Sequence, residues 1–232
     1  VMKYQHLFFD LDHTIWDFET NAKESLQDLY TAHNLAGRGV DNFDHFFDHY
    51  SAHNHRLWDR YTKGFIKQEE LKWKRMWLAL LEYKIADEKL SRQMSLDFLE
   101  VLPTKKALFD GTTELLTYLQ GKGYQMHLVT NGFENVQHQK IKHAGLDPYF
   151  GAVITSEASN SLKPNKEIFD YAFAKTGATA SNSIMIGDNQ DADIKGGINA
   201  GMDTIFVNHI GATPHVKATH EVFDLPSIAK LL

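Results

Sequence analysis

The sequence predicts an α/β protein in which a mostly parallel sheet is interrupted by an inserted helical bundle. From residue 103 onward, short apolar segments alternate with helix-like segments and turn residues, which is typical of parallel strands joined by covering helices. The block before it, residues 18–102, has a helical pattern with few glycines. The apolar strand that ends at Asp10 finds no partner strand in that block, so it must pair with the later strands. The helical block is therefore an insertion.

The inserted block is expected to form a small bundle of four helices. Its large apolar and aromatic residues recur at intervals of three and four, which places them on one face of a helix. The four groups are Leu26, Leu29, Tyr30 and His33; Phe43, Phe46, Phe47, Tyr50 and Trp58; Trp73, Met76, Trp77 and Leu80; and Leu96 and Leu99. The tryptophans are expected mainly in the bundle core, although such rings can also stack on a nucleobase.

The later part of the chain is expected to supply four further strands and their helices. The strands are predicted at 125–130, 152–156, 183–186 and 204–207, and the helices at 111–120, 135–144, 165–175, 192–200 and 226–232. Gly145, Gly177 and Gly201 each follow one of these helices, where a left-handed residue commonly ends a helix.

The composition limits the function classes. With 232 residues, 43% of them hydrophobic, the chain can bury a large core. A formal charge of −6 argues against a nucleic-acid polymer as partner, because phosphate backbones are bound by clustered lysine and arginine. The absence of cysteine excludes disulfides, thiolate zinc sites and a thiol nucleophile. With no signal-peptide pattern and no apolar run of about 18 residues, we expect no membrane association and a cytoplasmic location. The oligomeric state stays open.

Polar residues gather where the predicted strands end. Taken singly, each group also suits a structural role as a helix cap, a turn or a solvated side chain. However, the carboxyl ends of parallel strands meet at one edge of a sheet, where ligands bind. The coincidence of all the groups at that edge therefore favours a functional site. They are Asp10 and Asp12 after the first strand, Thr130-Asn131-Gly132 after the second, Lys163-Pro164 after the third, and Gly187-Asp188 with Asp193 after the fourth.

These residue types suit phosphoryl transfer through a carboxylate nucleophile. Alternate residues of a strand face the same way, so Asp10 and Asp12 are expected on one side, with Asp10 attacking phosphorus. A carboxylate repels a phosphate, so the site needs a hard cation such as Mg²⁺. Its expected ligands are Asp10, Asp188 and the backbone carbonyl of Asp12. Lys163 is expected to neutralise the remaining charge.

The other predicted groups handle the phosphoryl oxygens and the proton. The Thr130 hydroxyl and the backbone amides around Leu11, Asp12 and Asn131 are expected to bind the equatorial oxygens, with the Thr130-Asn131-Gly132 turn as the substrate-binding segment. Asp12 is placed to protonate the leaving alcohol and then to take a proton from the attacking water. Asp193 is a candidate to orient Lys163 or a metal-bound water.

Together these segments resemble the haloacid dehalogenase superfamily of phosphatases. Four motifs of the superfamily occur in the expected order: Asp10-Leu11-Asp12-His13-Thr14, Thr130-Asn131-Gly132, Lys163-Pro164, and Gly187-Asp188 with Asp193. The resemblance implies a Rossmann-like three-layer catalytic core, residues 1–17 and 103–232, with strand order 5-4-1-2-3. It also implies a helical C1-type cap, residues 18–102, that closes over the site, with Mg²⁺ as cofactor and a small phosphomonoester as substrate.

Closer similarity points to the nucleoside 5′-monophosphate phosphatase (5′-nucleotidase) branch. Other activities of the superfamily stay open, because a sugar-phosphate phosphatase or mutase shares all the core residues, and a phosphonate hydrolase needs only a reactive cap lysine. A dehalogenase would lack the equivalent of Asp12, and a non-catalytic ligand sensor would have lost a motif. The closer similarity lies in residues 15–18, 130–133, 163–172 and 193–201.

Histidines at two places in the sequence could either bind a ligand or serve only the fold. His13 stands where many superfamily members have glycine, and a structural role for it is favoured over contact with substrate. His45, His49 and His53 recur at four-residue spacing in the predicted cap, where they could line a helix face for a metal. No HExxH pattern or thiolate accompanies them, so we do not expect a metal site there.

Overall fold

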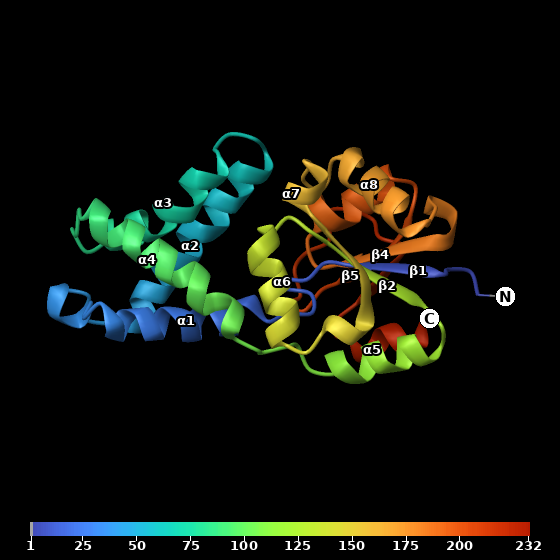
Figure 1. Ribbon diagram of the computed structural model, residues 1–232, viewed down its shortest axis with the longest axis horizontal. Coiled ribbons are helices and arrows are strands. Elements are labelled where there is room, and N and C mark those ends of the chain that lie inside the picture. The colour runs from blue at the N-terminus through green and yellow to red at the C-terminus, as the bar shows by residue number, and fades with distance from the viewer. Residues whose placement is uncertain (1) are drawn as a thin grey trace. The chain divides into compact units, whose positions relative to one another are not determined.

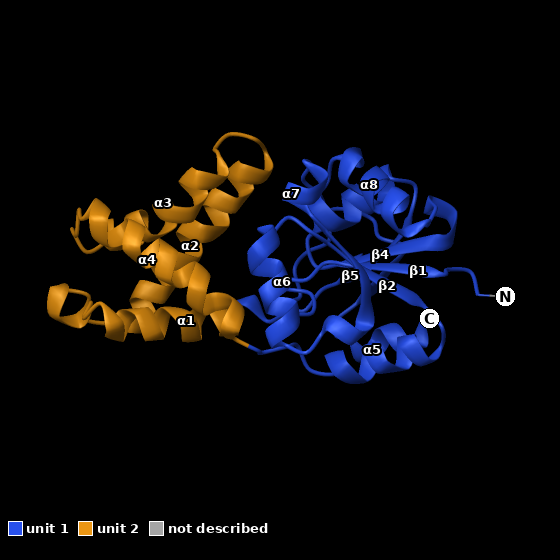
Figure 2. Ribbon diagram, in the orientation of Figure 1, with its two compact units in different colours: residues 1–18, 106–232 blue, residues 19–105 orange. Residues whose placement is uncertain are grey.

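A computed structural model describes residues 2–232, and it divides into two compact units (Figure 2). One unit runs to Phe18 and resumes at Lys106, and the other is Glu19–Lys105. The helical unit thus ends three residues beyond the predicted limit at residue 102. The 3₁₀ helix Leu102–Thr104 follows its last α-helix directly, and Lys105 pairs with Glu24 at 3.0 Å and with Asp28 at 2.7 Å.

A six-stranded parallel sheet in the order β3-β2-β1-β4-β5-β6 forms the centre of the first unit (Figure 1). The order of the first five strands is the predicted one, and β6 extends the edge beyond β5. The sequence pattern did not reveal β6, because its three residues form no apolar run. The strands are β1 (His6–Phe9), β2 (Gln125–Thr130), β3 (Phe150–Thr155), β4 (Ser183–Gly187), β5 (Asp203–Val207) and β6 (His220–Val222).

Helices cover both faces of the sheet, which confirms the predicted Rossmann-like α/β architecture. Figure 1 shows α5 (Thr112–Gly121) on one side and α8 (Lys166–Thr176) on the other. The other helices of this unit are α6 (Glu134–His143), α7 (Ser156–Ser159), α9 (Lys195–Asn199), the π-helical turn Gln190–Ile194 and the 3₁₀ helices Asp147–Tyr149, Ala180–Asn182 and Pro226–Lys230. Among residues 2–232, no helix has the length and apolar character needed to cross a membrane.

All four residues of β1 are buried, which explains its nearly continuous apolar sequence. Phe8 packs in one core cluster with Ile168 and Phe169 of α8. Burying a side chain of this size contributes roughly 1.5–3 kcal/mol. A Cβ at Gly197 would crowd the side chains of Thr204 and Met185, so the small residue lets α9 approach the sheet.

His127 of β2 satisfies a backbone group at a β-bulge in β3. The register of the two strands shifts between Met126 and Leu128, and the Ala152 amide donates to Nδ1 of His127 at 3.2 Å. Nε2 of His127 lies 3.1 Å from Nδ1 of His6. Because Nδ1 accepts, neutral His127 carries its hydrogen on Nε2 and donates to His6. Burial, followed by the charge of His6, lowers the pKa of His127 to about 4.

The two chain segments that enter and leave the helical unit are joined by backbone pairing. The Asp17 amide donates to the Ala107 carbonyl at 3.0 Å, and the Phe109 amide donates to the Ile15 carbonyl at 3.0 Å. These bonds flank an antiparallel bridge between Trp16 and Leu108. The helical unit therefore begins and ends at neighbouring points of the sheet domain.

The inserted segment forms the four predicted helices. Asn42 and Asp87 cap α2 and α4, each accepting the backbone amide three residues on. The bundle core includes Phe46, Tyr50, Leu57, Leu71, Met76, Leu80, Met94 and Phe98. The helices are α1 (Phe18–Ala32), α2 (Phe43–Thr62), α3 (Gln68–Leu81) and α4 (Glu88–Val101).

The tryptophans do not form the core of this unit, contrary to the prediction. Trp58, Trp73 and Trp77 are half-buried. On α3 the fully buried stripe runs through Met76 and Leu80, so Trp73 and Trp77 lie at its border. The large rings cover that border and keep one edge near water. The rings of Trp73 and Trp77 are 5.8 Å apart.

His53 of α2 is engaged with charged neighbours. Nε2 of His53 lies 2.9 Å from Oε1 of Glu82, and its Nδ1 lies 2.8 Å from Nη2 of Arg56. Both ring nitrogens of His53 are therefore in use. Within residues 2–232, the group of side chains spaced to hold a metal lies elsewhere, in the sheet domain.

Arg75 of α3 is a buried cation without an acidic ion-pair partner among the described residues. Its Nη1 donates to Oδ1 of Asn54 at 3.2 Å, and its guanidinium lies 4.9 Å from the centre of the Phe98 ring. Nε and Nη2 have no hydrogen-bond partner within residues 2–232. Burial lowers the pKa of Arg75. Such a group costs folding free energy.

Candidate active site

Parallel pairing brings the ends of β1, β2 and β4 to one edge of the sheet. Phe9 lies opposite Leu128 of β2 and Ile186 of β4. The residues that follow each strand therefore emerge side by side, and the Asp10 amide donates to the Ile186 carbonyl at 2.9 Å. Asp10, Thr130 and Asp188 are thus brought together by strand register alone.

Lys163 links two carboxylates from a buried position. Its Nζ donates to Oδ1 of Asp10 at 2.9 Å, to Oδ1 of Asp193 at 2.7 Å and to the Val129 carbonyl at 2.7 Å. Burial disfavours the charge, but the carboxylates of Asp10 and Asp193 outweigh it and raise the pKa of Lys163. The side chain therefore remains an ammonium, and all three of its hydrogens are used.

Asn131 holds the main chain of Lys163. Its Oδ1 accepts from the Lys163 amide at 2.7 Å, and its Nδ2 donates to the Lys163 carbonyl at 3.0 Å. The side chain of Asn131 is therefore a support for Lys163, which leaves only its backbone for the predicted contact with a phosphoryl group.

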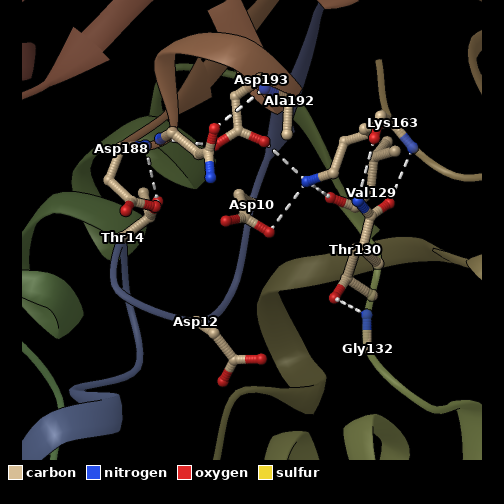
Figure 3. Close-up of polar contacts among 12 residues, drawn as sticks. Asp10, Asp12, Thr14, Val129, Thr130, Gly132, Lys163, Asp188, Ala192 and Asp193 are labelled. Carbon is tan, nitrogen blue, oxygen red and sulfur yellow. Dashed lines mark hydrogen bonds and ion pairs between the residues drawn. The ribbon is translucent and has the colours of Figure 1, made fainter. Parts of the chain in front are cut away.

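Three carboxylates surround this lysine. Oxygen atoms of Asp10, Asp188 and Asp193 lie within 4.8 Å of one another (Figure 3). Burial and the neighbouring charge of Asp193 raise the pKa of Asp10 to about 7. Burial, followed by the charges of Asp10 and Asp193, also raises the pKa of Asp188. One ammonium does not balance three carboxylates, so the cluster fits a hard divalent cation with oxygen ligands.

Thr14 orients Asp188, one of the predicted metal ligands. The Thr14 hydroxyl donates to Oδ1 of Asp188 at 2.8 Å and accepts from the Asp188 amide at 3.1 Å. Thr14 is fully buried, so this contact is shielded from water. The hydroxyl fixes one oxygen of the carboxylate and leaves the other for a cation.

A single π-helical turn, Gln190–Ile194, presents Asp193 to Lys163. The sequence pattern predicted an ordinary helix starting at 192. The second oxygen of Asp193 accepts from the Asn189 amide at 3.0 Å. A Cβ at Gly187 would overlap the Asp193 carboxylate, so glycine is needed at the end of β4. Asp193 is therefore tied to both the lysine and its own loop.

The Asp12 carboxylate points away from this cluster (Figure 3). Its Oδ1 accepts from Nζ of Lys140 at 2.8 Å, and its Oδ2 accepts from Nε2 of Gln137 at 2.9 Å. Burial alone would raise its pKa, but the charge of Lys140 and the hydrogen bonds from Lys140 and Gln137 outweigh burial and lower the pKa of Asp12. The Asp12 carboxylate is thus not directed at the carboxylate cluster, and only the backbone carbonyl of Asp12 remains as the ligand predicted for a cation there.

The Thr130 hydroxyl lies at the end of β2 between two donors. It accepts from the Gly132 amide at 3.0 Å and from Nε2 of Gln137 at 2.7 Å. The Gly132 amide is therefore engaged within the turn. A Cβ at Gly132 would overlap the Gln137 side chain, so the glycine permits this close approach.

His13 adopts a left-handed backbone conformation, with φ of 64°. This explains why glycine suits the position, since few other residues occupy this region, although asparagine, aspartate and histidine do so more often than the rest. Its ring packs 4.9 Å from that of Phe18. The contact supports a structural role for His13 at the turn after Asp12.

A family model for haloacid dehalogenase-like hydrolases matches residues 4–201. The chain belongs to this hydrolase family. The pyrimidine 5′-nucleotidase YjjG of Escherichia coli (strain K12) is 30% identical over 234 residues, which cover 100% of this chain and 99% of YjjG. The pyrimidine 5′-nucleotidase PynA of Streptococcus pneumoniae (strain ATCC BAA-255 / R6) is 30% identical over 235 residues, covering 100% of this chain and 96% of PynA.

A solved structure of this hydrolase family matches over the whole chain. The magnesium-bound crystal structure of the HAD-hydrolase YfnB from Bacillus subtilis superposes with a TM-score of 0.90 at 28% identity. The match covers 100% of this chain and 99% of YfnB. The superfamily resemblance predicted from the sequence motifs is therefore confirmed.

Sequence reasoning missed Gln137, Lys140 and Asn189 and gave Thr14 no role of its own. Gln137 and Lys140 are three residues apart, which places them on one face of α6. Polar residues on a helix ordinarily indicate a solvated face, yet both side chains are buried. The available signal was their position on the first helix after the Thr130-Asn131-Gly132 turn.

Proposed function

We propose that this hydrolase is a Mg²⁺-dependent phosphatase of nucleoside 5′-monophosphates that acts through a phosphoryl group carried on Asp10. One observation carries the proposal. Asp10 pairs with a buried ammonium and lies within 4.8 Å of two further carboxylates, whereas the side chain of Asp12, two residues on, pairs with Lys140. This separation supports one carboxylate as the nucleophile that attacks phosphorus and the other as the group that transfers the proton.

The proposed reaction has two displacements. In the first, an Asp10 oxygen forms a bond to phosphorus, the phosphorus–oxygen ester bond breaks, and the leaving oxygen takes a proton from Asp12. In the second, water attacks phosphorus and gives a proton to Asp12, and the bond to Asp10 breaks to release phosphate. Asp12 must therefore acquire a proton and reach the leaving oxygen when substrate is bound.

The other residues manage charge. Lys163 keeps a positive charge beside Asp10 throughout, and the Thr130 hydroxyl donates to a phosphoryl oxygen. Asp10, Asp188 and the backbone carbonyl of Asp12 are the proposed ligands of Mg²⁺, with Asp193 holding Lys163. Bound there, the cation would supply the positive charge that lets an anionic nucleophile approach an anionic substrate. The magnesium in YfnB supports this choice of metal.

Asp12 favours a phosphatase over a dehalogenase. A halide leaves without a proton, whereas an alkoxide leaving group needs one, and Asp12 is the carboxyl group placed to give it. The catalytic residues are compatible with a sugar phosphate as well as a nucleotide. The nucleotide assignment is supported by the similarity of the chain to the pyrimidine 5′-nucleotidases YjjG and PynA.

The test is turnover of a phosphomonoester panel with product identified. Purified protein with Mg²⁺ receives pyrimidine and purine 5′-monophosphates in ribose and deoxyribose forms, sugar phosphates and p-nitrophenyl phosphate. We expect free phosphate and nucleoside, with the highest kcat/KM for a nucleotide. If a sugar phosphate were hydrolysed at least tenfold more efficiently than every nucleotide, or were isomerised without release of phosphate, the nucleotide assignment would be wrong.

A further inference from the structure

The helix α6 places two buried polar side chains against Asp12. Gln137 and Lys140 are 0% and 2% exposed, and each donates to one oxygen of the carboxylate. Both oxygens of Asp12 are therefore held by one rigid element. Removing either donor would leave an oxygen of the Asp12 carboxylate unpaired, so the two side chains together fix the position of that carboxylate.

Gln137 also links Asp12 to Thr130. Its amide has two hydrogens, one directed at Oδ2 of Asp12 and the other at Oγ1 of Thr130. The Thr130 oxygen already accepts from the Gly132 amide, so it accepts two hydrogen bonds in all. Its own hydrogen must then point elsewhere, which makes Thr130 a donor toward a ligand oxygen.

Lys140 is held in place by aromatic rings as well as by charge. Its Nζ lies 4.4 Å from the centre of the Trp16 ring and 5.6 Å from that of Phe18. Trp16 is fully buried. A cation packed in this way beside a ring loses little further freedom when it pairs with Asp12. The position of the ammonium, and of the carboxylate oxygen it contacts, is therefore well defined.

We propose that Gln137 and Lys140 are positioning residues of the phosphatase site. Lys140 sets the location from which Asp12 serves the leaving oxygen, and Gln137 couples that location to the Thr130 hydroxyl, which serves the phosphoryl oxygens. The inference rests on the proposed function and extends it to two residues on a helix outside the superfamily motifs. It predicts different defects for the two residues. Lys140 acts only through Asp12, which serves the leaving oxygen, whereas Gln137 also acts through Thr130, which serves the phosphoryl oxygens.

The experiment measures the first phosphoryl transfer by rapid quench, with a nucleoside monophosphate and with p-nitrophenyl phosphate. The aryl ester hardly needs a proton on its leaving oxygen. For Lys140→Met we expect transfer from the nucleotide to fall about 10²-fold, the lower range of general acid catalysis, with little change for the aryl ester and an unchanged KM. Lys140→Arg should restore most of the nucleotide rate, since its guanidinium also donates to the carboxylate.

Gln137→Met should slow both substrates, because the Thr130 hydroxyl serves a phosphoryl group common to both. In the double variant Gln137→Met/Thr130→Val, the two losses should be far less than additive. Lys142→Met is the matched control, an exposed lysine on the same helix, and should behave as the parent protein. If Lys140→Met does not fold, Lys140→Gln tests the same contact with a neutral donor.

The outcomes separate this inference from the proposed function. If Asp12→Asn shows the nucleotide-selective loss but neither Lys140→Met nor Lys140→Gln does, the positioning role is overturned while the phosphatase mechanism stands. If Asp12→Asn slows both substrates equally, the acid role of Asp12 fails and the inference fails with it. Additive losses in the Gln137 and Thr130 double variant would remove the coupling through Gln137.

Discussion

Lys163 and Asp10 meet at 2.9 Å although they are 153 positions apart in the sequence. The ammonium is also bonded to Asp193 and to a backbone carbonyl, so it cannot turn away from Asp10 without losing buried hydrogen bonds. Asp10 is thus presented with one oxygen fixed by the lysine, and in the proposed reaction its other oxygen attacks phosphorus.

Asp10→Asn should abolish turnover without unfolding the protein. The amide has nearly the same shape but is a far weaker nucleophile, so we expect kcat to fall on the order of 10⁴-fold or more, as for other enzymes that lose a nucleophile. Phosphate release gives the rate, and circular dichroism checks the fold. A folded variant that kept more than a few per cent of the activity would contradict a phosphoryl group carried on Asp10.

Mg²⁺ should raise the thermal stability as well as the activity. A bound divalent cation would relieve the repulsion among Asp10, Asp188 and Asp193, and any ligand that binds only the folded state raises Tm with its concentration. Chelation should stop turnover, and Asp188→Asn should remove both the rise in Tm and activity at low Mg²⁺. Thr14→Val should weaken both effects. Full turnover in a chelator would exclude the metal assignment.

The His127 and His6 pair should make the sheet domain sensitive to acid. The folded-state pKa of His127 is about 4, below the ordinary value of 6.5, so protonation favours the unfolded chain. The stability that neutral His127 contributes is complete above pH 6.5 and is lost as the pH falls from 6.5 toward 4. Protonated Nδ1 would face the Ala152 amide, placing two donors together.

The check is the free energy of unfolding by urea between pH 8 and pH 4.5. His127→Gln should flatten the decline below pH 6.5, whereas His138→Gln, which removes an exposed histidine, should leave the curve unchanged. Identical slopes for the parent protein and His127→Gln would show that other groups cause the acid sensitivity.

Arg75→Met should stabilise the helical unit. The substitution keeps most of the packing volume and removes a buried cation that has two unpartnered nitrogen atoms. Replacing buried charged groups by apolar residues is often neutral or stabilising by about 1–4 kcal/mol. Urea unfolding measures the change in the free energy of unfolding. As a control, Lys63→Met, at an exposed lysine paired with Asp59, should change this free energy by less than about 0.5 kcal/mol. A loss of stability would mean that the contacts of the guanidinium with Asn54 and Phe98 outweigh the cost of burying it.

The sequence predicted those parts of the site that follow from strand geometry. Asp10 and Asp188 each follow an apolar strand directly and Thr130 is the last residue of one, and parallel register places them together without any knowledge of side-chain contacts. Gln137 and Lys140 could not be found in this way, because a polar helix face is ordinarily solvated and only packing against Trp16 and Asp12 shows otherwise. The π-helical turn at Gln190–Ile194 was also hidden, because one extra residue in a turn leaves no apolar periodicity to detect.

The fold was predicted from the sequence in about the same detail as the site. The alternation of strands and helices was sufficient for the parallel α/β architecture, and the superfamily resemblance implied the sheet order. The bulge at Ala152 and the short strand β6, in contrast, depend on local pairing that composition does not encode. On α3, helical spacing correctly indicated an apolar face but did not distinguish its centre, at Met76 and Leu80, from its border, at Trp73 and Trp77.

The hydrogen bonds from Asp17 to Ala107 and from Phe109 to Ile15 hold together the two chain segments that lead into and out of the helical unit. A segment whose two ends are already fastened together can be lengthened, shortened or exchanged for another without shifting any strand by a residue. The carboxylates beyond β1 and β4 would keep their spacing through such a change. We therefore expect that the helical unit can change during evolution while the residues of the candidate active site in the sheet domain are retained.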